Sequence, residues 1–459
     1  MSTKSSKAYD LEDLLPRWLL NAYTAPHIQS ALTILDERED ARAGKGMTSK
    51  AVAAVEANSS HLLNSTSNFY SSESTNFYSI VSGTSPENRL RNRYMDVLPY
   101  DRTRVKVQLP YFQNSGGVHA PQAVDEHSEG LYVNANWVQE KYGRKWWIAS
   151  QAPLRNTAYT FLSLLLEDVH PTTSTTADPS SMASTTQHIH WSCPRTVVQL
   201  TQNVESGRRK AHPYFPDVVG QTMIVVPDLT DLSSPSPSTF SISRSKLKVT
   251  LVAQEEIREA CCVKSIVEVR PFSTIQPAIQ FTHLLFVAWP DQSVPSPSDR
   301  AALFEFVRLV NRVNRQKPLD PSSSHTQKDD PPIIVGCSAG IGRTGSFIAM
   351  NSLLRHAGFL PPHEDSVLSQ SRSSSPSSFH TSQSVLLPHT STTPSDTSIN
   401  RTSNTPLGPL PATLSTDLVS QEIDSLREQR AGMVQRPEQA MLVYEMMVGA
   451  YVERGDLKR

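Results

Sequence analysis

The sequence predicts an α/β protein in which helices flank a mixed sheet. Short β-branched and apolar runs typical of strands alternate with segments whose apolar residues follow helical spacing. A short apolar strand, Ile333 to Val335, leads through a glycine-rich loop into a helix that opens at Arg343. The 459 residues are only 38% hydrophobic and 19% charged, which is low for that much packed protein. We therefore expect one packed domain with insertions.

The elements follow from these patterns in order. Two helices are expected at Leu11–Tyr23 and His27–Asp40, where apolar residues recur every three or four positions. Strands are expected at residues 105–109, 132–137, 146–150, 196–200, 247–253, 263–269 and 281–288. Ala301–Val313, behind Asp299, gathers its apolar residues on one face as an amphipathic helix does. A last helix is expected at Glu438–Glu453.

Low-complexity tracts mark the insertions. A single domain over residues 1–459, with a core from about residue 10, is expected to carry insertions near residues 42–75, 171–187, 231–243, 318–330 and 361–415. The last four are rich in Ser, Thr and Pro, so they cannot bury enough apolar area to offset their chain entropy. We expect them to be disordered loops.

Composition excludes several classes of function. A formal net charge of −1 gives no global attraction to nucleic acid or to an anionic membrane. The polar start is not typical of a signal peptide, and no apolar run reaches the ~20 residues of a membrane helix. The four cysteines form no secreted disulfide framework. His188, His190 and Cys193 have metal-like spacing, but ordinary strand residues are the favoured interpretation and no metal is expected.

The run from Cys337 to Arg343 carries the chemistry. Small residues between them let backbone N–H groups turn inward as an anion-binding nest, at a helix N-terminus and beside a guanidinium. The same field favours a thiolate at Cys337. A Cys six residues before an Arg is weak evidence alone; the glycine-rich filling, the hydroxyl of Thr344, the strand before and the helix after make it specific.

The run resembles the signature loop of the protein tyrosine phosphatases, His-Cys-x-x-Gly-x-x-Arg-Ser/Thr. Five further stretches are similar to family motifs, in the family's order: residues 92–105, which contain Tyr94 and Asp96; 132–136 with 148–157; 205–216; Trp289-Pro290-Asp291; and 435–439. The resemblance implies a highly twisted mixed sheet and a protein-tyrosine phosphatase, a phosphoric monoester hydrolase that needs no cofactor.

The chemistry assigns the central roles. A phosphate monoester requires a site that neutralises its oxygens, so Cys337 is the expected nucleophile, and it forms a cysteinyl-phosphate. Arg343 is expected to hold the phosphate together with the backbone N–H groups of the loop. The loop residues are Ser338, Ala339, Gly340, Ile341 and Gly342. Asp291 is the expected acid and then base, and Thr344 donates to the sulfur.

The resemblance implies the remaining roles. Tyr94 walls the substrate ring and Asp96 fixes the peptide backbone. Gln435 positions water and Gln439 assists it. The supporting residues are Glu205, which braces the arginine, with Lys210, Trp289 and Pro290.

Two departures from the family pattern keep alternatives open. Gly336 stands where the family has histidine, which is expected to raise the pKa of Cys337 relative to a histidine-bearing relative, and Gln292-Ser293 follows the acid. A phosphotyrosine-binding protein without turnover is therefore one alternative. A dual-specificity phosphatase is another, although an aromatic-walled pocket keeps a short side chain from the sulfur. Arsenate reduction and sulfur transfer are more distant alternatives.

The resemblance and the thiol chemistry also predict the partners and the cellular compartment. The expected partners are phosphotyrosine-containing proteins, with no nucleic acid and no membrane, and the insertions are candidates for docking a kinase or scaffold protein. Because Cys337 must stay reduced, we expect the cytoplasm, with the nucleus as the second compartment.

Overall fold

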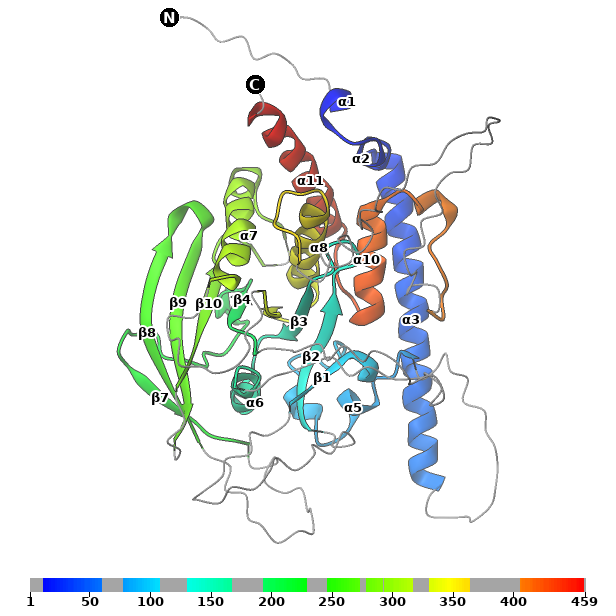
Figure 1. The fold of residues 1–459 in the computed structure, drawn as a ribbon. Coiled ribbons are helices and arrows are strands. Elements are labelled where there is room, and N and C mark those ends of the chain that lie inside the picture. The colour runs from blue at the N-terminus through cyan, green and yellow to red at the C-terminus, as the bar shows by residue number, and fades with distance from the viewer. Residues whose placement is uncertain are drawn as a thin grey trace, which may run out of the picture.

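A computed structural model describes residues 11–59, 77–107, 130–166, 193–228, 246–272, 278–291, 293–316, 330–363 and 405–457. Nine of its strands form one twisted sheet in the order β1-β2-β3-β11-β4-β10-β9-β8-β7 (Figure 1). The strands are β1 (Arg104–Val107), β2 (Leu131–Gln139), β3 (Trp146–Gln151), β4 (Thr196–Gln199), β7 (Thr222–Val225), β8 (Leu247–Ile257), β9 (Cys262–Pro271), β10 (Ile279–Phe286) and β11 (Ile333–Cys337). A separate hairpin joins β5 (Val204–Glu205) to β6 (Arg208–Arg209).

The sheet is mixed, as the sequence predicts. Its centre is parallel, with β11 between β3 and β4 and β10 beyond β4, and both flanks are antiparallel. Ile333, Ile334 and Val335 are all buried, because a central parallel strand is covered on both faces. β11 therefore delivers Cys337 to the carboxyl edge of the sheet.

The helices are α1 (Leu11–Leu14), α2 (Arg17–Ala22), α3 (Ala25–Ser59), α5 (Val81–Thr84), α6 (Ala158–Ser163), α7 (Arg300–Asn314), α8 (Gly342–His356), α10 (Leu418–Gln429) and α11 (Pro437–Leu457). Short 3-10 turns are η1 (Arg89–Arg91), η2 (Asp101–Thr103), η3 (Arg155–Thr157), η6 (Arg258–Ala260), η7 (Pro297–Asp299) and η8 (Ala412–Leu414). The first expected helix is split into α1 and α2, because Pro16 has no backbone N–H to continue it.

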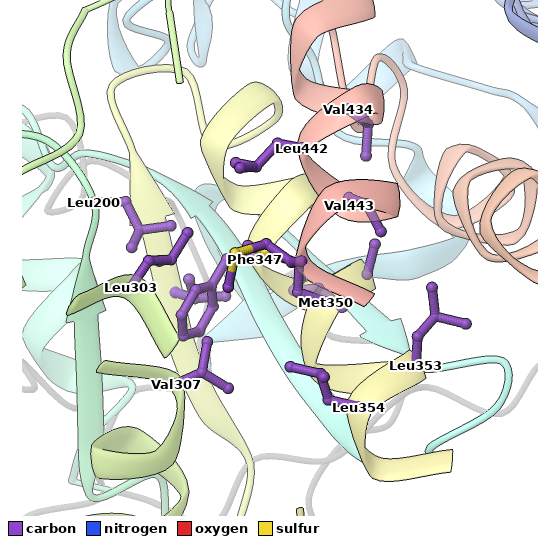
Figure 2. Close-up of a cluster of buried hydrophobic side chains, with 14 of the residues drawn as sticks. Leu200, Leu303, Val307, Phe347, Met350, Leu353, Leu354, Val434, Leu442 and Val443 are labelled. Carbon is purple, nitrogen blue, oxygen red and sulfur yellow. The ribbon is translucent and has the colours of Figure 1, made fainter. Parts of the chain in front are cut away.

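The larger part of the core surrounds α8. Figure 2 shows Phe347 and Met350 of α8 between side chains of α7 and of α11. The expected apolar face of α7 is confirmed, since its members Leu303, Phe306, Val307, Val310 and Val313 are buried. All but one residue of α8 are buried, so the helix that begins at the Cys337 loop is held rigidly from every side.

The expected insertions meet the described structure only in part. Residues 42–59 are helical and continue α3, which Figure 1 shows running beside α10 and beyond it. Arg42 is fully buried in ion pairs with Asp424 and Glu428, which explains the continued helix. Residues 60–75, 171–187, 231–243, 318–329 and 364–404 lie outside the described residues, whereas Asp330, residues 361–363 and residues 405–415 are described, and Asp330, His363 and Leu414 are buried.

Several described elements were not expected from the sequence, among them α5, α6, the β5–β6 hairpin, β7 and α10. α10 shapes the site most, because it begins at a capping carboxylate, Asp417, and places two buried arginines near the Cys337 loop. Its buried residues are largely polar, so an apolar pattern could not reveal it.

Candidate active site

The loop from Cys337 to Arg343 is a tight backbone turn between β11 and α8. Gly340 has a φ of +73°, and a Cβ there would collide with the carbonyl of Ser150 on β3. Only glycine fits both demands. Cys337 is 6% exposed at the end of its strand, so the sulfur lies at the floor of a small site.

The pKa of the Cys337 thiol is lowered from its ordinary value. Burial acts against this by raising it, but the positive charge of Arg343 and the hydroxyl of Thr344 more than compensate, with the backbone N–H groups of Thr344 and Gly340. Thr344 Oγ1 is buried and has no other hydrogen-bond partner among the described residues, which leaves it for the sulfur. The loop therefore favours a thiolate.

Arg343 is fixed by a carboxylate and a carbonyl. Its Nη1 donates to Glu205 Oε1 at 2.7 Å and to the carbonyl of Leu200 at 2.9 Å, and its Nη2 donates to Glu205 Oε2 at 2.8 Å. Burial disfavours its charge, yet Glu205, the Cys337 sulfur and Asp291 raise its pKa. The guanidinium is a permanent cation held in one plane beside the sulfur.

The expected acid lies directly against this arginine. Asp291 Oδ1 accepts from Arg343 Nη2 at 3.2 Å, and Oδ2 lies 2.6 Å from Lys210 Nζ. Trp289 is buried and its Nε1 donates to the carbonyl of Ser293 at 3.0 Å, which closes the turn around Asp291. Pro290 is exposed, and Gln292 lies outside the described residues.

Tyr94 contacts the Cys337 loop at Ser338. Its hydroxyl lies 2.8 Å from Ser338 Oγ, which in turn donates to the carbonyl of Lys210 at 2.8 Å. The ring is therefore tied to the Cys337 loop and to the segment after the β5–β6 hairpin. Asp96, two residues later, is exposed, where a peptide backbone can reach it.

The two glutamines differ in position. Gln439 is 4% exposed, its Oε1 accepts from the N–H of Arg436 at 3.1 Å, and its amide fills the space where Gly342 lacks a side chain. Gln435 is exposed and follows Val434, whose φ of 56° is strained for a β-branched residue.

Two arginines of the α10 region support the site, and sequence reasoning missed both. Arg430 is fully buried and donates to the carbonyls of Gly340 at 2.8 Å and Ala339 at 3.1 Å. Arg427 donates to the carbonyls of Met433 and Val434, each at 3.0 Å. Their three-residue spacing places both near one helix face, which was the only available signal.

Gly336 lies where β11 packs closely against β3. A Cβ at this position would lie 2.6 Å from the carbonyl oxygen of Ser150, with which Gly336 is in register across the sheet. β11 and β3 thus approach too closely here for any side chain.

The described residues contain neither a cluster of metal-ligating side chains nor a membrane-spanning helix. Among the described residues no group of three or more His, Cys, Asp or Glu side chains is placed to hold a metal ion; His188 and His190 lie outside those residues. None of the helices in the described ranges combines the length and apolar character that crossing a bilayer requires.

Comparisons with known proteins give a consistent result. The sequence profile of a family described as protein-tyrosine phosphatase matches residues 88–385. Human receptor-type tyrosine-protein phosphatase eta is 30% identical over 268 residues, which are 58% of this chain and 14% of that protein. Human tyrosine-protein phosphatase non-receptor type 9 is 30% identical over 274 residues, 59% of this chain and 35% of the relative. Human non-receptor type 13 is 26% identical over 277 residues, 59% of this chain and 8% of the relative. The chain thus spans well under two thirds of these relatives.

Proposed function

The chain belongs to the protein-tyrosine phosphatase family, and on this premise we propose that it hydrolyses phosphotyrosine in proteins through a cysteinyl-phosphate intermediate. The observation that carries the proposal is one cluster: a thiol of lowered pKa, the braced guanidinium of Arg343 and the carboxylate of Asp291 on that guanidinium. Nucleophile, anion holder and proton donor meet at one point.

The first step forms a sulfur–phosphorus bond. The Cys337 thiolate attacks phosphorus while Arg343 and the loop N–H groups hold the three equatorial oxygens, whose charge grows in the transition state. The bond from phosphorus to the tyrosine oxygen breaks, and that oxygen takes the proton of Asp291. The free tyrosine then leaves.

The second step breaks the sulfur–phosphorus bond. A water molecule gives its proton to Asp291 and its oxygen to phosphorus, and the thiolate departs. Gln435, exposed at the rim, would orient that water with help from Gln439. The hydroxyl of Thr344 stabilises the departing thiolate, as it does the resting one.

Asp291 must exchange partners during this cycle. Without substrate, its two oxygens contact Arg343 and Lys210. A bound phosphate competes for Arg343, which frees one carboxylate oxygen to carry the proton toward the leaving oxygen. The loop around Trp289 is then the mobile element that opens for exchange of substrate and product.

Tyr94 supports a preference for phosphotyrosine over phosphoserine. The ring stands beside the loop, held by Ser338, so the pocket would have an aromatic wall above Cys337, a residue that is only 6% exposed. A flat aromatic ester can reach this depth, whereas a short aliphatic one cannot. The dual-specificity alternative predicts equal hydrolysis of both.

Gly336 is the specific observation behind the second candidate, phosphotyrosine binding without turnover. The histidine's support for the thiolate is missing, while Arg343, Thr344 and the loop N–H groups remain. These remaining supports for the anion favour catalysis. The described cysteines are free, and a thiolate mechanism suits a reducing compartment, so we also propose the cytoplasm or nucleus.

The test measures phosphate release from a phosphotyrosine peptide and a matched phosphoserine peptide by the purified chain. We expect release from the first only, no turnover by Cys337→Ser, and a loss of about 10² or more in Asp291→Ala with binding retained. Binding by the wild-type protein without phosphate release would instead establish the binding-only function.

A further inference from the structure

The last three strands of the sheet have an open outer face. β7, β8 and β9 end the strand order, and Figure 1 shows β7 and β8 on the side of the molecule away from α3. Their inward side chains are buried in one core cluster, which contains Val225, Leu247, Val249, Val267 and Val269. Because side chains alternate along a strand, the residues between these point to the opposite face. We call nine residues there the β7–β9 face: Thr222, Ile224, Val226, Lys246, Lys248, Thr250, Glu268, Arg270 and Phe272.

This face continues the side of the sheet that α7 covers. Leu284 and Phe286 of β10 belong to the core cluster that contains the apolar residues of α7, and they lie in register with Lys264 and Cys262 of β9. Steps of two residues lead from Cys262 to Arg270, so Arg270 lies on the α7 side of the sheet. A helix laid on the β7–β9 face would therefore extend the helical layer of this fold.

Three apolar side chains of the β7–β9 face, Ile224, Val226 and Phe272, are exposed. They lie in two adjacent rows across the strands, since Ile224 pairs with Lys248, and the N–H of Phe272 donates to the carbonyl of Lys246 at 2.7 Å. The solvated face of an antiparallel sheet is ordinarily polar. Neighbouring exposed apolar side chains with a charged border are typical of a contact surface.

Two cations lie directly opposite each other on this face. Lys248 of β8 is in register with Arg270 of β9, and neither forms an ion pair within the ranges that the structure describes. Like charges in this arrangement repel and destabilise a strand pair. Farther along the same two strands Lys264 meets Glu255 at 2.8 Å, which is the favourable arrangement of opposite charges. An anion placed over Lys248 and Arg270 would balance their repulsion.

We propose that the β7–β9 face binds an acidic amphipathic helix of a partner protein. The apolar stripe of that helix covers the exposed apolar side chains, and its carboxylates pair with Lys248 and Arg270. The face holds three cations and one anion, Glu268, so its charge complements an acidic partner. Binding here requires neither Cys337 nor the hydrolysis of a phosphate ester.

The dimensions of the face favour a helix over a strand. Strands of a sheet lie about 4.8 Å apart, so a strand added beyond β7 would lie about 14 Å from β9, which carries Arg270. A helix is about 10 Å wide, and it spans β7 to β9 when it lies on the face. A second copy of the chain, placed on the same face by a two-fold axis, would bring like charges together. An acidic helix therefore matches the face better than a strand or a second copy.

The experiment measures the binding of two synthetic peptides to the purified chain by fluorescence anisotropy. Both peptides are about four helical turns long and carry Leu on one face, and the flanking positions are Glu in one peptide and Gln in the other. Circular dichroism checks that their helicity is equal. We expect the Glu peptide to bind about tenfold more tightly than the Gln peptide, and added salt to reduce this ratio.

Variants assign the binding to the β7–β9 face. Lys248→Gln/Arg270→Gln should abolish the preference for the Glu peptide, and Phe272→Ser should weaken both peptides about tenfold. Lys264→Gln is the matched control and should keep the preference, because Lys264 lies on the same side of the sheet but already pairs with Glu255. The double variant should unfold at the same temperature as the wild-type protein or at a higher one, because a repulsion is removed.

Equal binding of the two peptides by the wild-type protein, or a preference that survives Lys248→Gln/Arg270→Gln, would overturn the proposal. A lower unfolding temperature of the double variant would do the same, because the two cations would then support the fold. Displacement of the Glu peptide by a phosphotyrosine peptide would place it at the Cys337 loop instead. A wild-type dimer that dissociates in the double variant, measured by sedimentation, would assign the face to self-association and also overturn the proposal.

Discussion

Arg343 and Glu205 form two parallel hydrogen bonds, Nη1 to Oε1 at 2.7 Å and Nη2 to Oε2 at 2.8 Å. Their side chains are 7% and 9% exposed, so the pair lies largely out of water. One carboxylate, on a hairpin remote in sequence, thus sets the plane of the guanidinium that we propose holds the phosphate. Through this contact Glu205 both orients the Arg343 guanidinium and balances its charge.

Glu205→Gln keeps the shape of the brace and removes its charge. We expect kcat of this variant to fall about tenfold or more, because Arg343 loses its fixed plane. Glu205→Ala should in addition lower the free energy of unfolding by about 3 kcal/mol, because it leaves a buried cation unpaired. Steady-state kinetics and denaturant unfolding check this. The control is Glu255→Gln. Glu255 also pairs with a cation, Lys264, but its side chain is 59% exposed. This substitution should change neither kcat nor the unfolding free energy measurably.

Thr344→Val tests whether the hydroxyl of Thr344 stabilises the Cys337 thiolate, and it predicts the direction in which the pH profile of the thiol shifts. Thr344 lowers the pKa of Cys337, so removing its hydroxyl should raise that pKa. Because only the thiolate is alkylated, the rise of the iodoacetate rate with pH should move to higher pH in the variant. Thr344→Ser should restore the wild-type profile. Superimposable profiles for wild type and Thr344→Val would contradict this role.

Helix α3 contacts the segment before Gln435, the proposed water-positioning residue, directly at Gly432 and through Arg427. Glu39 Oε1 accepts from the N–H of Gly432 at 2.6 Å, and Arg427 Nη1 donates to the carbonyl of Leu35 at 2.8 Å while its other nitrogens hold Met433 and Val434. These bonds secure the strained Val434 that precedes Gln435.

Arg427→Lys should therefore slow breakdown of the intermediate more than its formation. We expect about a tenfold lower kcat and a burst of free tyrosine product in the first turnover, because the water-orienting segment relaxes while Cys337 and Arg343 stay in place. Stopped-flow kinetics measures both phases. Arg312→Gln, at an exposed position of α7, is the control. A fall in kcat without a burst would count against this assignment.

Gly336→Ala should destabilise the fold. The new Cβ would lie 2.6 Å from the carbonyl of Ser150, so β11 and β3 must separate at a cost of about 1–3 kcal/mol. Denaturant unfolding checks this against Gly44→Ala in α3, where nothing beyond the chain neighbours and the adjacent helix backbone lies within 4 Å of the new Cβ. Helix propensity predicts a gain of up to about 1 kcal/mol there. Unchanged stability of Gly336→Ala would mean that the strands are not so closely apposed.

The strands and the Cys337 loop could be predicted because their signals are local. Apolar runs such as Ile333 to Val335 indicate buried strands directly, and the glycines after Cys337 indicate a tight backbone turn. The approach of Glu205 and Asp291 to the Cys337–Arg343 loop could not be predicted from a local pattern, since the loop and the two carboxylates lie on three separate segments. Their catalytic roles stay predictions.

The support beneath the loop could not be predicted. Arg430 is a charged residue that is fully buried, against the usual preference, because Asn134, Asn136 and two loop carbonyls satisfy its donors. Such a set of partners depends on the path of the whole chain. The length of α3 was missed for a related reason, since ion pairs of Arg42 rather than an apolar stripe hold residues beyond Asp40.

The most direct test of the central claim is rapid acid quench of the protein mixed with a phosphotyrosine peptide, followed by peptide mass spectrometry. The account predicts one phosphoryl group on the fragment that contains Cys337, present during turnover in the wild-type protein and absent in Cys337→Ser. Full turnover by Cys337→Ser, or wild-type turnover with the phosphoryl group never found on that cysteine, would contradict it.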